Sequence, residues 1–284
     1  MTAPCLHPYA ELCVTSNFSF LRGASHPEEL VTRAAELGLA AIAITDRNSV
    51  AGVVRAFSAL KELARLRDEA QAETMQDGPA IRSQQVIDHS SRQSMTYAAG
   101  EAATSVQSDA PLPKLIAGAR VVLTDSAVEW LALPTDLAAW SRLTRLLSLG
   151  KRRAAKGECH LTRADLADWG AGLILIALPP DPLEDAAPDA TRADLLAIAR
   201  SFPGQCFLGA APRYEGRDQG RLNRLALLAQ GVNLPLVAVG DVLMHRANRR
   251  PLADVLTCIR EGITIDAIGE RRLANGERRL KSGA

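Results

Sequence analysis

Three polar side chains alternate along one short apolar stretch near the start of the chain. In "YAELCVTSNFSF" (residues 9–20), Glu11, Cys13 and Thr15 are separated by single apolar residues. Alternate residues of a strand point to the same face, so a carboxylate, a thiol and a hydroxyl should lie side by side. Such a set is typical of a metal or catalytic site, and equally of the remains of one. A buried Glu11 must ligate an ion or pair with a cation, and Arg47 and Arg120 are the candidate cations.

Two aspartates follow other apolar stretches. Asp46 lies in "TDRN" (45–48) and Asp241 in "GDVLMH" (240–245), where strands are expected to end. The carboxyl ends of strands carry the functional groups of α/β proteins, so each aspartate could bind a metal or act as a general base. The alternative is that each carboxylate caps the following helix or turn. His245 could be a ligand, but we favour a surface position for it.

Basic residues gather in two places. The first is "KRRAAK", with Lys151, Arg152, Arg153 and Lys156, and the second contains Arg246, Arg249 and Arg250. Such groups can contact phosphates, face solvent or dock a neighbouring domain. The net charge of +1 does not decide between these roles, and an aromatic content of 4% argues against a base-stacking platform.

Short apolar runs alternate with amphipathic helical patterns along most of the chain. This alternation predicts an α/β fold, either a barrel or a doubly wound sheet. Helix 25–38 should be capped by Ser25 and stopped by Gly38. Strands are expected at 39–45, 114–124, 172–178, 205–211 and 234–241, and further helices at 49–66, 137–149, 162–170, 191–201 and 218–230.

Three stretches break the pattern. Residues 67–113 are polar and have little periodicity, which predicts a disordered or loosely ordered insertion within a domain spanning 1–270. Residues 179–190 should be mobile, and the polar tail 271–284 reads as the start of a linker. The five scattered cysteines and the lack of an apolar leader or membrane span favour a soluble, cytoplasmic protein with no membrane partner.

Several of these blocks together resemble a known family. The segment "YAELCVTSNFSFLRGASHPEELVTRAAELGLAAIAITDRNSVAGVVRA", followed by "LSLGKRRAAKGECHLTRADL", "LPLVAVGDVLMHRANRRPLADVLTCIREG" and "LANGERRLKS", is similar to the opening of bacterial error-prone C-family DNA polymerases. These are relatives of the polymerase III alpha subunit, and their opening is a PHP (polymerase and histidinol phosphatase) domain. The resemblance implies a distorted β/α barrel at 1–270 and a linker at 271–284 toward an absent palm domain.

The resemblance also implies where a PHP metal cluster would lie and how it is altered. Most of the histidine ligands of the family are replaced here, by residues such as arginine and leucine that cannot coordinate a metal. We therefore expect no metal cofactor, no catalytic residue, and ion pairs from Glu11 and Cys13 to Arg47 or Arg120. The degenerate ligand positions are Glu11, Cys13, Asp46, Arg47, Arg120, Arg213, Asp241 and Leu243.

The expected function follows from the family. The chain would be the N-terminal part of a translesion polymerase, a nucleotidyltransferase working in DNA replication, repair and damage-induced mutagenesis. Without the paired palm aspartates, this part alone should be an inactive structural module. Its partners would be the palm, fingers and thumb, DNA, the sliding clamp and translesion accessory proteins. The alternatives are a stand-alone PHP metal-dependent phosphoesterase or 3′–5′ exonuclease, and a non-functional gene remnant.

Overall fold

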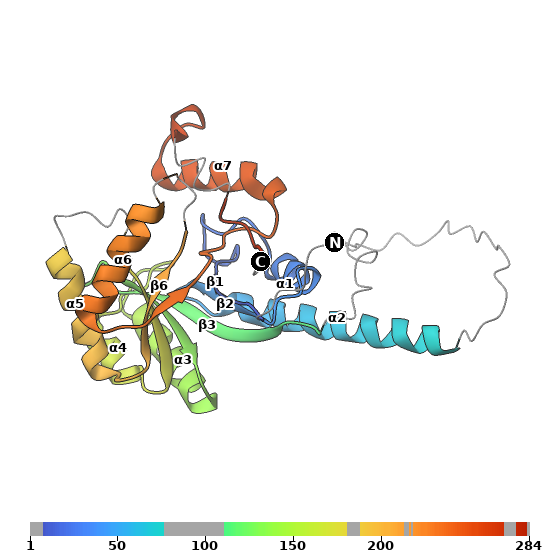
Figure 1. Cartoon of the computed structure of the whole chain (residues 1–284), viewed down its shortest axis with the longest axis horizontal. Coiled ribbons are helices and arrows are strands. Elements are labelled where there is room, and N and C mark those ends of the chain that lie inside the picture. The colour runs from blue at the N-terminus through green and yellow to red at the C-terminus, as the bar shows by residue number, and fades with distance from the viewer. Residues whose placement is uncertain are drawn as a thin grey trace.

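A curled seven-stranded sheet forms the centre of the molecule (Figure 1). The computed structural model describes residues 8–76, 111–180, 188–212, 216, 218–269 and 277–282. Strands that follow one another in the chain are neighbours in the sheet. They are β1 (Ala10–Val14), β2 (Ala41–Arg47), β3 (Lys114–Val122), β4 (Glu129–Pro134), β5 (Leu173–Leu178), β6 (Cys206–Ala210) and β7 (Leu236–Ala238).

The sheet is mixed, because β4 is antiparallel to both of its neighbours. Strands β1 to β3 are parallel, as are β5 to β7. Strand β4 was not predicted. The alternative of a doubly wound sheet is wrong, because the strands follow chain order from edge to edge without a reversal. The sheet curls until its two edges approach, where Val242 N donates to Cys13 O (2.8 Å) and Thr15 N to Val242 O (2.9 Å). The expectation of a distorted β/α barrel is confirmed.

The helices cover the outside of the curled sheet, and a smaller apolar cluster fills its inside. Helices α3 to α6 pack on β3 to β6, α1 and α2 pack on β1 and β2, and α7 lies above the sheet in Figure 1. The inner cluster includes Cys13, Ala43, Leu131 and Ile176. The helices are α1 (Pro27–Glu36), α2 (Ala51–Gln76), α3 (Leu137–Arg152), α4 (Arg163–Trp169), α5 (Pro188–Ser201), α6 (Asp218–Val232) and α7 (Arg250–Glu261), with short 3₁₀ turns at Ala247–Arg249 and Asp266–Ile268.

Helix α1 begins one residue later than the sequence suggested. His26 is its N-cap and forms a capping box with Glu29, whose side chain accepts from His26 N at 2.9 Å. Ser25 does not cap the helix, because its buried hydroxyl contacts His245 instead. Gly38 follows the helix with a positive φ of 65°, as expected of a helix stop.

The boundaries of the irregular stretches also differ from expectation. Helix α2 continues to Gln76, so residues 67–76 are helical; ion pairs from Arg65 to Glu62 and Glu69 support this extension. Residues 77–110 and 181–187 lie outside the described part, and α5 starts at Pro188, within the stretch expected to be mobile.

Part of the expected linker belongs to the folded body. Residues 270–276 and 283–284 lie outside the described part, but 277–282 are described. Arg279 forms a bridge with Met244, and Leu280 is buried against the cluster behind β1 and β2. Apolar burial and backbone pairing therefore hold this segment, which sequence polarity alone did not indicate. None of the described helices has the length and apolar character needed to cross a membrane.

Candidate functional site

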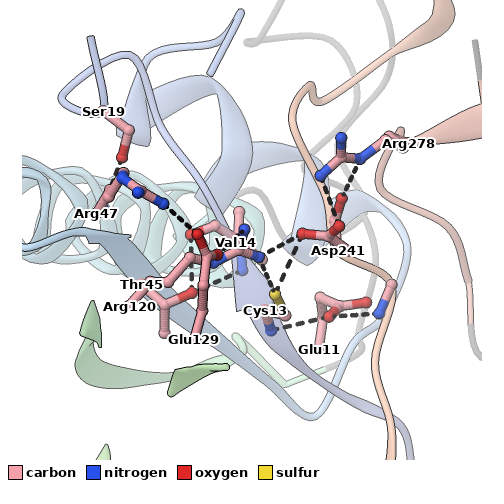
Figure 2. Close-up of polar contacts among 11 residues, drawn as sticks. Glu11, Cys13, Val14, Ser19, Thr45, Arg47, Arg120, Glu129, Asp241 and Arg278 are labelled. Carbon is pink, nitrogen blue, oxygen red and sulfur yellow. Dashed lines mark hydrogen bonds and ion pairs between the residues drawn. The ribbon is translucent and has the colours of Figure 1, made fainter. Parts of the chain in front are cut away.

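Arg120 on β3 lies between the thiol of Cys13 on β1 and the carboxylate of Asp241 after β7 (Figure 2). Its Nη2 donates to Cys13 Sγ at 2.9 Å and forms a close ion pair with Asp241 Oδ1. The thiol and that carboxylate oxygen are themselves 3.6 Å apart. Arg120 is only 8% exposed, so its charge is held inside the protein. One guanidinium thus joins two segments from opposite edges of the sheet.

Asp241 is held by a second arginine from the end of the chain. Arg278 Nη2 lies 2.6 Å from Asp241 Oδ2, and Arg278 Nε donates to the Asp241 carbonyl at 3.0 Å. Asp241 adopts a positive φ of 47°, a conformation that aspartate tolerates better than most residues. Its carboxylate therefore has one arginine on each oxygen.

Glu129 on β4 extends the network toward the surface. Its carboxylate accepts from Arg120 Nη1 at 3.4 Å and forms a close ion pair with Arg47 Nη1. Arg47 and Arg120 are register partners across β2 and β3, so their side chains emerge next to one another. The chain of groups Arg278, Asp241, Arg120, Glu129 and Arg47 is called the arginine network below. Glu129 was missed because β4 itself was not predicted.

The electrostatics of the network favour a neutral thiol and a charged guanidinium. Burial raises the pKa of Cys13 to about 12, although Arg120 opposes the shift. Burial lowers the pKa of Arg120, but its acidic neighbours, the Asp241 and Glu129 carboxylates among them, raise it well above its ordinary value. The carboxylates of Asp241 and Glu129 therefore both lie against the Arg120 guanidinium.

Glu11 lies apart from the arginines. Its Oε1 accepts from Cys13 N and Gly240 N, both at 2.9 Å, and its Oε2 accepts from the Tyr9 hydroxyl at 2.9 Å. Pairing of Glu11 with Arg47 or Arg120 is therefore wrong. Cys13 does contact Arg120 as expected, but through a hydrogen bond to a neutral thiol and not through an ion pair. Burial raises the pKa of Glu11 despite these three donors. The close approach depends on Gly240, because a Cβ there would lie 2.2 Å from Glu11 Oε2.

Asp46 organises the loop after β1. Its buried carboxylate accepts from Ser16 N and Ser16 Oγ, both at 2.8 Å, and from Ser19 Oγ at 2.7 Å. Capping of the following helix is therefore not its role, since its donors come from the preceding loop. Burial raises the pKa of Asp46. The hydroxyl of Thr15 is buried without a hydrogen-bond partner among the described residues.

The other degenerate positions do not add donors to the network. Leu243 is buried, and its backbone N donates to Arg278 O at 2.8 Å. Arg213 lies outside the described residues. His245 is not a surface residue, because its Nδ1 lies 2.8 Å from Ser25 Oγ and 3.7 Å from Glu29 in a largely buried position. Burial lowers the pKa of His245.

Of the first basic group, residues 151–156, only Arg153 has a carboxylate partner within the described residues. Arg153 binds both oxygens of Asp165, at 2.8 and 2.7 Å. Lys151 and Lys156 line a surface cleft, whereas Arg152 is exposed outside it. In the second group, every arginine has a carboxylate partner: Arg246 pairs with Glu36, Arg249 with Glu29 and Arg250 with Asp254. The second group is thus engaged in ion pairs at its own surface.

The residues at the strand ends do not fit a PHP metal cluster. Among the described residues, no group of three or more His, Cys, Asp or Glu side chains is arranged to hold a metal ion. Cys13 and Asp241 have the Arg120 guanidinium between them, and its charge repels a cation. The Asp46 carboxylate accepts hydrogen bonds from Ser16 and Ser19. Glu11 has its oxygens turned to backbone and tyrosine donors. An arginine thus occupies the centre of the donor set.

The chain is 60% identical over 277 residues to an error-prone DNA polymerase of Ruegeria pomeroyi, covering 97% of this chain and 24% of that protein. It is 42% identical over 276 residues to an error-prone DNA polymerase of Rhodopseudomonas palustris, covering 97% and 21%. The chain therefore spans about a quarter or less of the length of these relatives.

The chain also has low-identity matches among solved structures. They include a metal-dependent phosphoesterase from Bifidobacterium adolescentis and an amidohydrolase from Chromobacterium violaceum, the latter with bound sulfate and no metal. Each is 15% identical, covers 82% of this chain and 87% of its own, and has a TM-score of 0.46. The family model of the PHP domain matches residues 11–177, and the chain belongs to the PHP domain family.

Proposed function

We propose that this chain is the PHP-domain part of an error-prone DNA polymerase and serves there as a catalytically inactive structural module. The observation that carries the proposal is the position of Arg120 between Cys13 and Asp241. A metal cluster links the strand ends that supply its ligands, and here a buried guanidinium links β1, β3 and the segment after β7. The arginine network replaces that cross-link with ion pairs and hydrogen bonds.

The same replacement removes the hydrolytic chemistry. Metal-dependent phosphoesterases use the ion to lower the pKa of a bound water and to polarise the phosphoryl group. A guanidinium has no empty orbital for a water oxygen and stays protonated, so Arg120 can hold anions but cannot generate hydroxide. Cys13 is buried as a neutral thiol and is unsuited to nucleophilic attack. The stand-alone phosphoesterase and exonuclease alternatives therefore lack their reactive group.

The partners of the module follow from the relatives. The present chain matches no more than about a quarter of each error-prone polymerase, so the remainder of such a polymerase is the proposed partner. That remainder would supply the palm, fingers and thumb, and through them DNA, the sliding clamp and translesion accessory proteins. The proposed setting is DNA synthesis past damage, with its associated mutagenesis, in the cytoplasm.

Metal content tests the inactive site directly. The protein should be purified without chelators and analysed for zinc, manganese and iron by mass spectrometry. We expect far less than one ion per chain, and no Mn²⁺-dependent cleavage of an aryl phosphodiester or a 3′-labelled oligonucleotide. The variant Asp241→Asn is the control, because cleavage that survives it comes from a contaminant. Stoichiometric metal with cleavage that Asp241→Asn abolishes would overturn the proposal in favour of a phosphoesterase or exonuclease.

Assembly tests the structural role. The part of the Ruegeria pomeroyi relative outside the matched region should be produced alone and mixed with this chain. We expect the two to elute together in size-exclusion chromatography and the relative's part to gain thermal stability. Independent elution of two folded proteins would contradict a structural module.

A further inference from the structure

An open cleft lies beside the arginine network. Its walls are the loop after β1, the ends of β2 and β3 and the segment after α3, and its volume is about 790 Å³. Four cationic side chains line it: Arg22, Arg47, Lys151 and Lys156. Only one acidic side chain, Glu158, is among the described lining residues, and it lies 3.4 Å from His160 on the same wall. The cleft therefore carries an excess of positive charge.

Most of this charge is not neutralised by the protein. Arg47 pairs with Glu129, but no carboxylate pairs with Arg22, Lys151 or Lys156 within the described residues. The pKa of Arg22 falls to about 10 because of burial and then of the nearby Arg47 and Arg260 charges. Positive charges so placed destabilise one another, and an anion in the cleft would relieve that repulsion.

The loop after β1 adds aromatic surface to the same cleft. Phe20 is 84% exposed and Phe18 is 39% exposed, so two of the five phenylalanines of the chain lie at this one cleft. The expectation that a low aromatic content excludes base stacking therefore does not apply at this cleft. Between Phe20 and Arg22, Leu21 adopts a positive φ of 56°, which is strained for a bulky residue, and its carbonyl accepts from Arg260 at 2.9 Å. The strained turn presents an arginine and an exposed ring to one cleft.

We propose that this cleft binds single-stranded DNA without a metal, with phosphodiesters at Arg22, Lys151 and Lys156 and a base stacked on Phe20. A basic groove combined with exposed aromatic rings is the typical arrangement for single strands. The volume exceeds that of one phosphate group, and a duplex has no free base face for Phe20. The choice of DNA as the ligand rests on the proposed polymerase context, whereas the site itself rests on the cleft.

Fluorescence anisotropy tests the proposal. The full 284-residue chain is titrated into a labelled oligo-dT of about 12 nucleotides, within the range of single-strand site sizes, at increasing NaCl. Three phosphate contacts predict a slope of about −2 in a plot of log K against log salt concentration. Arg22→Gln and Lys151→Glu should each weaken binding about tenfold, and Phe20→Ala severalfold.

A neighbouring residue supplies the matched control. Arg152→Glu makes the same charge change as Lys151→Glu in the same last turn of α3, but Arg152 does not line the cleft. It should weaken binding less than about twofold, as expected of a screened surface charge. Circular dichroism on every variant confirms that the fold is kept.

Several outcomes would overturn the proposal. Equal losses of oligo-dT affinity in Lys151→Glu and Arg152→Glu would indicate a general charge effect. A wild-type chain that does not bind oligo-dT at low salt would show that the cleft is not a DNA site. Equally tight binding of duplex DNA, polyglutamate or pyrophosphate would exclude single-stranded DNA as the specific ligand. Metal content, and assembly with the unmatched part of the Ruegeria pomeroyi polymerase, do not depend on the cleft. These two measurements therefore distinguish a failure of the DNA-binding proposal from a failure of the proposed structural role.

Discussion

Replacement of Arg120 by methionine should lower the free energy of unfolding by about 3 kcal/mol. Removing one partner of a buried ion pair costs about 3–5 kcal/mol, because the remaining charge is left without compensation. Here Asp241 keeps Arg278 and Glu129 keeps Arg47, so the lower end of that range applies. Methionine fills a similar volume and packs against the Cys13 thiol, which limits any cavity contribution.

Arg47→Met is the matched control for this prediction. Arg47 binds the same Glu129 carboxylate and is the register partner of Arg120, but its side chain is 29% exposed rather than 10%. A partly exposed ion pair contributes less than about 1 kcal/mol, so the loss should be correspondingly small. Equilibrium urea denaturation followed by tryptophan fluorescence measures both, since Trp130 on β4 is fully buried.

A double mutant tests whether the cost comes from the unpaired carboxylate. Asparagine at position 241 keeps a side chain that tolerates positive φ and leaves no charge behind. Arg120→Met combined with Asp241→Asn should therefore be at least about 1 kcal/mol more stable than the sum of the single losses predicts. Two results would refute the role of Arg120 as a buried ion-pair partner. One is an equal loss of unfolding free energy in Arg120→Met and Arg47→Met, and the other is a strictly additive loss in the double mutant.

Three further predictions concern the interior around β1. Gly240→Ala should lower the free energy of unfolding by about 1–3 kcal/mol in urea denaturation, because its Cβ meets Glu11. Gly220→Ala in α6 should be neutral or stabilising, because a Cβ there makes only an ordinary contact with the Arg224 side chain at 3.7 Å. Equal effects of the two substitutions would contradict the tight fit at Gly240. Burial raises the pKa of Glu11, so the stability that this group contributes is present below its ordinary value of 4.5 and is lost as pH rises. Glu11→Gln should therefore become increasingly stable relative to wild type from pH 4.5 to 8, and a constant difference would count against the raised pKa. Iodoacetamide at pH 8 should modify the partly exposed Cys159 but not the buried Cys13 until urea unfolds the protein, as peptide mass mapping would show; early labelling of Cys13 would place it at the surface.

Much of the architecture was predictable from local pattern. The apolar runs at 39–45, 114–124, 172–178 and 205–211 are strands, because buried strands need continuous apolar sequence. Strand β4 was missed, since "EWLALP" is short and periodicity cannot separate a short strand from a neighbouring helix. With β4, the antiparallel pairing and Glu129 were missed as well. The extension of α2 and the packing of 277–282 also depended on contacts that local sequence does not contain.

The amino-acid sequence by itself determined that Arg47, Arg120 and Leu243, whose side chains lack the lone pairs that coordination requires, stand at positions that the family resemblance predicts for PHP metal ligands. It also placed Glu11 and Cys13 on one strand, Asp46 near the end of the next, and Asp241 after the last. Only the tertiary structure decided their partners. Cys13 and Asp241 are 228 residues apart in the chain and meet because the sheet curls. The same curl brings Gly240 N to Glu11, and Arg120 then contacts the Cys13 thiol and the Asp241 carboxylate. The partners of these buried groups are set by the strand register, by the close approach of Gly240 to Glu11 and by the packing of residues 277–282 against the body. All three arise only when the chain folds.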